Sequence, residues 1–214
     1  MDIHTKFPTT FYDSFLTDDE HKYLVNYSDK IYSYLTSYQK EQALIISSTE
    51  EWSTDYVTKD LKLENIFEKF VKTLEAFLPQ VKMESVEHWF IYSSLSHKEP
   101  ISVTHGAHFD DNKWSIKENH TVEAPSLIAI YYLYETPTAI RVFNIDYKMK
   151  SIVSRIPEQL IQFEEIACKE NRLIVFPGDK YHGVVGTLKE EGVCKRTGLV
   201  FNLWKDSPQR PWWI

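Results

Sequence analysis

Cysteine is scarce in this chain, because Cys168 and Cys194 are the only two among 214 residues. Two cysteines so far apart make neither a disulfide framework nor a Cys-x-x-Cys metal or redox motif. The sequence also lacks an apolar N-terminal signal segment, an apolar stretch long enough to cross a membrane, internal repeats and low-complexity linkers. We therefore expect a cytoplasmic protein that has no membrane partner.

Positive charge is in deficit as well. The chain has 24 Lys and Arg against 31 Asp and Glu, which gives a net charge of −7, and it contains no Lys/Arg block. Nucleic-acid-binding proteins concentrate positive charge, so we expect no nucleic-acid partner. At this length the chain is most simply one domain, residues 1–214, able to bury about 70% of the surface of its unfolded form.

Helical support is predicted over residues 1–80. Thr17-Asp18-Asp19-Glu20 has the capping-box spacing of a hydroxyl and a carboxylate three residues later, so a helix should begin there and continue to about residue 38. A second helix is predicted from an apolar stripe at helical spacing that ends before Pro79. The residues of this stripe are Leu63, Ile66, Phe67, Phe70, Val71, Leu74, Phe77 and Leu78.

From Ser85 the pattern changes to one typical of β-strands. Strands are predicted over 86–92, 101–103, 126–134, 140–145, 173–176 and 197–204, with a long loop over 111–125 and a helical turn within 157–163. Two helices followed by about eight strands, without β–α alternation, indicate a mainly β fold with N-terminal helices. We expect a double-stranded β-helix, the cupin-like jelly roll, over residues 85–206, backed by two amphipathic helices.

His108-Phe109-Asp110 is the strongest candidate for a metal-binding motif. Residues i and i+2 of a strand point to the same face, so the His108 imidazole and the Asp110 carboxylate can converge on one metal ion. His182, just beyond the strand predicted at 173–176, can supply a third ligand. Two imidazoles and one carboxylate with open positions opposite them form the facial triad of non-haem Fe(II) oxygenases. Fe(II) is preferred over Zn(II), because a structural zinc ion has all four of its coordination positions filled by Cys or His, and neither cysteine is near the motif.

A competing set of ligands would be cupin-like and would consist of His105, His108 and His182. Positions i and i+3 of an extended strand face opposite ways, so this set requires a bulge between His105 and His108. Such a set would indicate a cupin-type metalloprotein, which binds its metal without an organic cosubstrate such as 2-oxoglutarate. A jelly roll that acts only as a binding module is the alternative outside catalysis.

Arg196 opens the last apolar strand, Thr197–Trp204, where a buried cation needs an anion. The order of His108, Asp110, His182 and Arg196 resembles the 2-oxoglutarate/Fe(II)-dependent oxygenases, on their prolyl-4-hydroxylase-like side. The resemblance rests on motif order over residues 86–206. It implies an iron dioxygenase, a hydroxylase that consumes 2-oxoglutarate and O₂ and gives succinate and CO₂.

The resemblance also implies cosubstrate ligands. Arg196 would pair with the distal carboxylate of 2-oxoglutarate, for which a forked donor suits better than a lysine. Tyr132 would add a hydroxyl to that carboxylate, and Tyr92 would lie near the cosubstrate's other end. In these relatives a basic residue follows the second histidine more closely than Arg196 follows His182, which leaves Lys189 and Lys195 as alternatives to Arg196.

Two tryptophans, Trp114 and Trp204, are candidates for the wall of the substrate pocket. The Gly-Gly-x-Thr turn of the prolyl-hydroxylase-like relatives is replaced by residues 135–139, so the substrate side of the pocket should differ. We expect the oxidation of an unactivated C–H bond in a small molecule or an amino acid, free or carrier-bound. The alternative substrate is a protein side chain.

Overall fold

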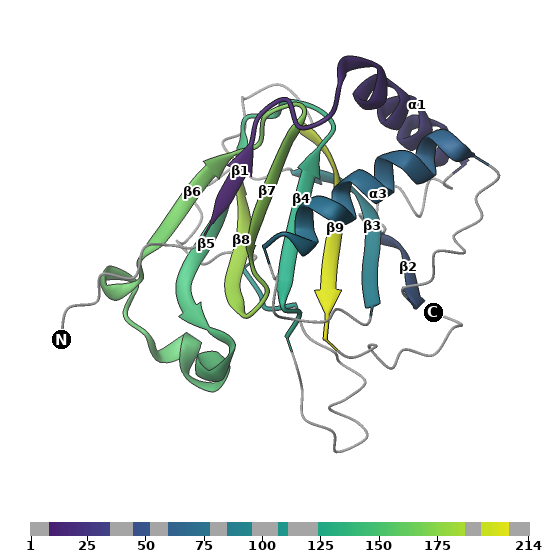
Figure 1. Cartoon of the computed structure of the whole chain (residues 1–214). Helices are drawn as coiled ribbons and strands as arrows, with labels where there is room; N and C mark the ends of the chain where they lie inside the picture. The colour runs from purple at the N-terminus through teal and green to yellow at the C-terminus, as the bar shows by residue number, and fades with distance from the viewer. Residues whose placement is uncertain are drawn as a thin grey trace.

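The computed structural model describes residues 9–34, 45–51, 60–77, 85–95, 107–110, 124–186 and 194–205. This part of the chain is mostly β, with two long α-helices and two 3₁₀ segments (Figure 1). In chain order the elements are β1 (Thr10–Tyr12), α1 (Asp18–Tyr34), β2 (Ile45–Glu51), α3 (Leu61–Glu75), β3 (Ser85–Leu95), β4 (Leu127–Tyr132), β5 (Thr138–Asp146), η1 (Tyr147–Arg155), η2 (Glu158–Leu160), β6 (Phe163–Ala167), β7 (Arg172–Pro177), β8 (Lys180–Gly186) and β9 (Cys194–Trp204).

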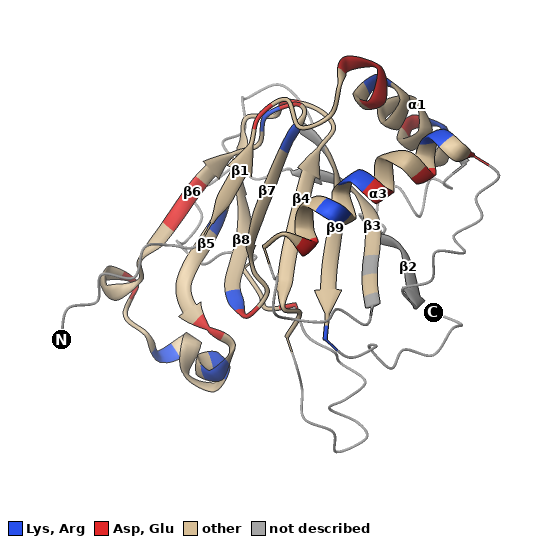
Figure 2. Cartoon of the chain, in the orientation of Figure 1, with Lys and Arg blue, Asp and Glu red and all other residues tan. Residues whose placement is uncertain are grey.

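The strands form two antiparallel sheets. The larger sheet has the order β1-β7-β4-β9-β3-β2 and the smaller one has the order β6-β5-β8. Strands adjacent in a sheet are mostly distant in sequence, as β4 shows by lying between β7 and β9. Figure 2 shows that β4 and β7 in the middle of the larger sheet carry few charged side chains, as expected for strands buried on both faces.

Strand β4 separates two cores, because its six residues are all buried and alternate in direction. Leu127, Ala129 and Tyr131 pack with buried side chains of α1 and α3. Ile128, Ile130 and Tyr132 pack between the sheets, against Ile140 and Val142 of β5 and Ile174 and Phe176 of β7. The two helices lie across the outer face of the larger sheet (Figure 1), so its inner face is left for the smaller sheet.

Helix α1 begins where its sequence predicts, and α3 carries the predicted apolar stripe. The Glu20 carboxylate accepts hydrogen bonds from the Thr17 backbone N–H at 2.8 Å and from its hydroxyl at 2.9 Å, while the Glu20 N–H donates to the Thr17 hydroxyl at 3.3 Å. This is the predicted capping box. Helix α3 is capped by Asp60, whose carboxylate accepts from the N–H groups of Lys62 and Leu63, and it buries Leu63, Ile66, Phe70 and Leu74 as the stripe predicts.

The expected order of two helices followed by strands is wrong in one respect. β1 precedes α1 and β2 lies between α1 and α3, so strands of the larger sheet are interleaved with the helices. The sequence around β2 is Ile45-Ile46-Ser47-Ser48-Thr49-Glu50-Glu51, which reads as a polar connection because only its first two residues are apolar. β2 is an edge strand that pairs only with β3 among the described strands, so one neighbour suffices to hold it.

The remaining strand predictions agree with β3, β4, β5, β7 and β9, and the helical turn near residue 158 is η2. Strands β1, β6 and β8 and the 3₁₀ segment η1 are not anticipated. The predicted strand at 101–103 and most of the predicted loop at 111–125 lie outside the described residues. None of the helices in the described ranges is long and apolar enough to cross a membrane.

A buried polar cluster joins the start of α1 to the outer face of the larger sheet. The Tyr131 hydroxyl lies 2.6 Å from Nδ1 of His21 and donates to Oδ1 of Asn171 at 2.9 Å. The Asn171 amide also accepts from the Leu16 N–H and donates to the Leu16 carbonyl, each at 2.9 Å. Asn171 has a φ of 55°, a left-handed conformation that asparagine tolerates better than most residues. The cluster therefore fixes the chain entering α1 against the turn before β7.

Replacing Tyr131 by Phe should destabilise the fold by about 1–3 kcal/mol, because His21 and Asn171 lose a buried partner. The free energy of unfolding from urea denaturation measures this effect. Tyr134→Phe is the control, since its hydroxyl bonds Asp29 at the exposed surface, and it should change stability by less than about 0.5 kcal/mol. Equal effects of the two changes would contradict the role given to the cluster.

Candidate metal centre

A short backbone pairing brings together the two segments that carry the predicted ligands. The His108 N–H donates to the His182 carbonyl at 2.8 Å, and the His182 N–H donates to the His108 carbonyl at 3.0 Å. This antiparallel bridge attaches residues 107–110 alongside β8. The two imidazole rings consequently lie side by side, with centroids 4.7 Å apart.

Gly183 makes this close approach possible. A Cβ atom at Gly183 would lie 2.8 Å from the Ala107 Cα and 3.0 Å from the Ala107 Cβ. Real Cβ atoms essentially never come so near a backbone atom, and the backbone cannot yield as a flexible side chain would. The glycine after His182 is thus required for the segment carrying His108 to pair with β8.

Phe109 turns the other way and anchors the motif. It is buried beneath η1, with its ring centroid 4.9 Å from that of Tyr181 and 5.3 Å from that of Tyr147. Because alternate residues of extended chain face opposite sides, His108 and Asp110 are placed together on the other side. The predicted i and i+2 geometry is present.

The side chains of His108, Asp110 and His182 converge. One ligand atom from each lies within 4.8 Å of the others, which makes this a group able to hold a metal ion. Nε2 of His108 is 3.4 Å from Oδ1 of Asp110. The His108 side chain is 56% exposed, whereas Asp110 is 17% exposed in its side chain and His182 is buried, so solvent reaches the group from the His108 side.

The His182 ring is held in the tautomer that a metal ligand needs. Its Nδ1 lies 3.0 Å from the Lys180 carbonyl oxygen, which can only accept a hydrogen bond. Nδ1 therefore carries the proton, and Nε2 keeps its lone pair for a metal ion. A ligating histidine usually has such a partner on its other nitrogen, which fixes the ring orientation.

The Asp110 carboxylate is oriented from two sides. His108 faces Oδ1, and the Asn202 amide Nδ2 donates to Oδ2 at 2.9 Å. Burial on its own would raise the pKa of the Asp110 carboxyl, but the hydrogen bonds from His108 and Asn202, and the attraction of the two imidazoles whenever they carry an added proton, hold this pKa below its usual value. The group is thus ionised at neutral pH and able to bind a cation.

Asn202 is the residue of this centre that the motifs do not identify. The signal available in the sequence is an amide inside the otherwise apolar run Leu199-Val200-Phe201-Asn202-Leu203-Trp204. A buried amide in such a run needs a hydrogen-bond partner, and Asp110 supplies one.

Two further histidines in the described ranges, His21 and His88, lie on the helix side of the larger sheet, away from the triad. His88 packs against Phe67 and Phe201, with ring centroids 4.9 and 6.1 Å away. Burial lowers the pKa of His88 to about 4, so it is neutral in the fold. It is a core side chain.

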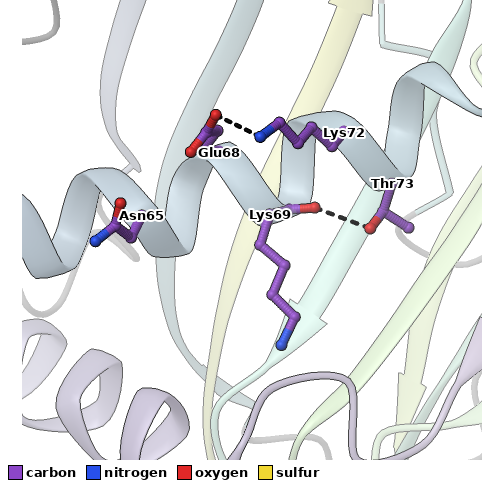
Figure 3. A pocket seen from close by; sticks show the side chains of 5 residues that line it. All are labelled: Asn65, Glu68, Lys69, Lys72 and Thr73. Carbon is purple, nitrogen blue, oxygen red and sulfur yellow. Dashed lines mark hydrogen bonds and ion pairs between the residues drawn. The ribbon is translucent and has the colours of Figure 1, made fainter.

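A shallow pocket on α3 is not a second candidate. It is lined by Asn65, Glu68, Lys69, Lys72 and Thr73, which all belong to this one helix (Figure 3). Lys72 pairs with Glu68 at 2.5 Å, and the Thr73 hydroxyl donates to the Lys69 carbonyl at 2.8 Å. The Lys69 ammonium pairs with Glu20 of α1 at 2.9 Å. The charged groups of this pocket are thus already engaged, as on an ordinary solvated surface.

The other predicted site residues fall into two groups. Tyr132 is fully buried between the sheets, and Trp204 is buried at the end of β9. Arg196, Lys195 and Tyr92 lie on described strands, but their side chains are outside the described residues, as are the whole of Trp114, His105 and Lys189. On β3, Trp89 and Ile91 pack between the sheets, and Phe90 packs on the helix side.

The fold is shared with several solved structures. A Pseudomonas putida prolyl-4-hydroxylase superposes with a TM-score of 0.53 at 13% sequence identity, over 93% of this chain and 89% of that one. HygX from Streptomyces hygroscopicus, solved with nickel and 2-oxoglutarate bound, gives 0.52 at 8% identity over 95% and 86%. The epimerase SnoN, in complex with Fe³⁺, alpha ketoglutarate and nogalamycin RO, gives 0.53 at 9% identity over 92% and 79%.

Comparisons of sequence find no relative, whereas comparisons of structure do. No protein-family model matches the chain, and no curated protein sequence matches it. The structural matches have the fold of 2-oxoglutarate/Fe(II)-dependent oxygenases, and they confirm, at the level of fold, the resemblance that the order of the motifs indicates.

Replacing Gly183 by Val should separate residues 107–110 from β8 and so disperse the ligands. We expect Ni(II) affinity to fall at least about tenfold in a calorimetric titration, together with a loss of roughly 1–3 kcal/mol in stability. Val185→Ala is the control on the same strand and should keep its Ni(II) affinity. Unchanged Ni(II) binding by Gly183→Val would show that the close approach is not needed.

Proposed function

We propose that this protein is an Fe(II)- and 2-oxoglutarate-dependent dioxygenase that hydroxylates a C–H bond. The observation that carries the proposal is the convergence of His108, Asp110 and His182, with one ligand atom from each within 4.8 Å of the others. The shared fold supports it, because solved structures with this fold include an alpha ketoglutarate dependent epimerase and prolyl 4-hydroxylases.

We infer further that the two sheets are the halves of a jelly roll. From β3 onward the chain passes repeatedly between them, since β3, β4, β7 and β9 belong to the larger sheet and β5, β6 and β8 to the smaller. Residues 107–110, which pair with β8, extend the smaller sheet to a fourth position. The succession of the strands and their antiparallel pairing support a double-stranded β-helix over residues 85–206.

The donor set fits ferrous iron. It offers two neutral imidazole nitrogens and one carboxylate oxygen from one side, and the partly exposed His108 marks a side where further ligands can enter. When bound, Fe(II) with 2-oxoglutarate and O₂ supplies the oxidising power, and the products include succinate and CO₂. The protein's part is to hold the ligands in place: the Lys180 carbonyl fixes the ring of His182, and Asn202 fixes the carboxylate of Asp110.

The cosubstrate's distal carboxylate would lie deeper between the sheets, near Tyr132. Tyr132 pairs with Gly198 across β4 and β9, and a Cβ at Gly198 would already contact Ile130 at 3.6 Å and Tyr132 at 3.9 Å. The absent side chain leaves room beside the tyrosine. Positions 196, 198 and 200 are two residues apart on β9 and so belong to the same face of the strand. We therefore assign Arg196 as the cation that pairs with that carboxylate.

Arg172 lies directly opposite Tyr132 on the neighbouring strand β7, but its guanidinium already has hydrogen-bond partners. Its guanidinium donates to both carboxylate oxygens of Asp13, at 2.5 and 2.8 Å, and to the Ala167 carbonyl at 3.0 Å. An arginine satisfied in this way has little capacity left for a ligand. Lys189 and Lys195 remain the alternatives to Arg196, and Tyr92 stays the residue proposed for the cosubstrate's other end.

We assign the substrate to small molecules and amino acids, free or carrier-bound. The solved structures with this fold include an enzyme of nogalamycin biosynthesis and prolyl hydroxylases, so both small molecules and amino-acid side chains suit the architecture. Buried Trp204 is the described candidate for the wall of the substrate pocket. Hydroxylation of a protein side chain is the alternative.

The direct test is anaerobic titration of the purified protein with Fe(II) and then 2-oxoglutarate. A weak visible charge-transfer band should develop only when both are present. Without such a band the proposed cofactor set is wrong. Screening amino acids, peptides and small metabolites for stimulated succinate release would then identify the substrate class.

Asp110→Ala separates the proposed triad from a set of three histidines. If Asp110 is a ligand, the change removes the one anionic donor, and Fe(II) affinity should fall by at least about a hundredfold, with loss of succinate formation. His182→Ala should do the same. Retained iron binding in Asp110→Ala would favour the alternative set with His105, and thus a cupin-type metalloprotein.

Arg196→Ala tests the cosubstrate assignment. If Arg196 pairs with the distal carboxylate, the change leaves a buried anion without its partner, a loss of roughly 3–5 kcal/mol, so 2-oxoglutarate binding should weaken at least about a hundredfold. Fe(II) affinity should hardly change, since Arg196 is not a metal ligand.

Two further variants sharpen this test. Arg196→Lys should fall between Ala and the parent, because it keeps the charge and loses the forked geometry. Lys205→Ala removes an exposed charge just beyond the same strand and should bind 2-oxoglutarate as the parent does. Normal binding by Arg196→Ala would move the assignment to Lys189 or Lys195.

A further inference from the structure

We propose that Asn202 is a positioning residue that restricts Asp110 to binding the metal through one oxygen, and so keeps a position free for the cosubstrate or O₂. This inference rests on the proposed function. A carboxylate can bind a metal ion through one oxygen or through both. A second bound oxygen would close one of the three positions that the triad leaves open, and 2-oxoglutarate with O₂ requires all three.

The two oxygens of Asp110 have different surroundings. Oδ1 lies on the histidine side, 3.4 Å from Nε2 of His108. Oδ2 accepts a hydrogen bond from Nδ2 of Asn202 at 2.9 Å. The Asn202 atom must be the amide nitrogen, because an ionised carboxylate cannot donate. One oxygen is thus presented with the imidazoles, while the other is turned toward β9.

Asn202 is well placed to resist rotation of the carboxylate. It is 1% exposed and lies on β9, which has β4 on one side and β3 on the other. Asn202 pairs with Ile128 of β4 and with Glu87 of β3. A donor fixed on a central strand holds its acceptor more firmly than one on a loop.

The amide oxygen of Asn202 indicates that the stability of the fold alone does not account for an asparagine at this position. Its Oδ1 is buried and has no hydrogen-bond partner among the residues that the structure describes. A buried carbonyl oxygen without a donor is unfavourable, so an apolar side chain would suit this strand better. The contact with Asp110 is what an asparagine adds here.

Asn202→Val and Asn202→Thr form the test pair, because they have nearly the same shape and differ in one hydroxyl group, which restores a hydrogen-bond donor on the side of Asp110. The probe is Mn(II) with the full-length protein, and the measurement is the number of exchangeable water ligands, from water-proton relaxation. We expect Asn202→Val to lose one such water, whereas Asn202→Thr keeps the parent's number. Mn(II) affinity of Asn202→Val should stay within about threefold of the parent, since all three ligands remain.

Binding of 2-oxoglutarate to the Mn(II)-loaded proteins is the second measurement. It should weaken at least about tenfold in Asn202→Val and be largely restored in Asn202→Thr. Thr197→Val is the matched control, because Thr197 is a buried residue of the same strand whose hydroxyl likewise has no described partner, and it falls on the face with Leu199, toward the helices. It should match the parent in both measurements.

The outcomes separate this inference from the proposed function. A folded Asn202→Val with the parent's water number, or one that loses Mn(II) as completely as Asp110→Ala, overturns the inference and leaves the proposed function standing. A parent that binds Mn(II) but not 2-oxoglutarate overturns the proposed function, while the water number still decides whether Asn202 sets the binding mode of Asp110. A parent that binds no Mn(II) overturns both.

Discussion

The candidate site depends on the pair of backbone hydrogen bonds between His108 and His182. These bonds join a short segment to β8 and place one ligand directly opposite another. The geometry of the imidazoles thus follows from main-chain pairing, and side-chain packing only completes it. Phe109 holds the segment from the far side, and Gly183 permits the approach. A substitution of either residue would displace the candidate ligands, although neither residue is a ligand itself.

The convergence of His108, Asp110 and His182 could be predicted from sequence because it follows from local backbone geometry. The two-residue period of a strand brings His108 and Asp110 to one face, and a strand ending in a turn presents His182. Capping chemistry likewise marks the start of α1, and an apolar stripe marks α3. Strongly apolar strands such as β4 and β7 are visible for the same reason, since they are buried on both faces.

What sequence reasoning missed depends on partners distant in the chain. β1 and β2 are held by their neighbours in the larger sheet, β7 and β3, and their own composition carries little signal. Asn202 acquires its role only when β9 lies beside the segment carrying Asp110. Alternation along a strand says only that Tyr131 and Tyr132 point in opposite directions. The fold decides that Tyr131 faces the helices and Tyr132 faces the space between the sheets.

The pairing of Asp13 with Arg172 has a consequence for the protein's behaviour in concentrated solution. It lies just after β1, a strand of three residues that covers the outer edge of β7. β7 is almost entirely buried and apolar, and such an edge, if uncovered, is a template for pairing with strands of other molecules. Phe11, stacked beneath the Arg172 guanidinium, adds to the attachment. We therefore expect this small strand and its ion pair to limit pairing between molecules through the edge of β7.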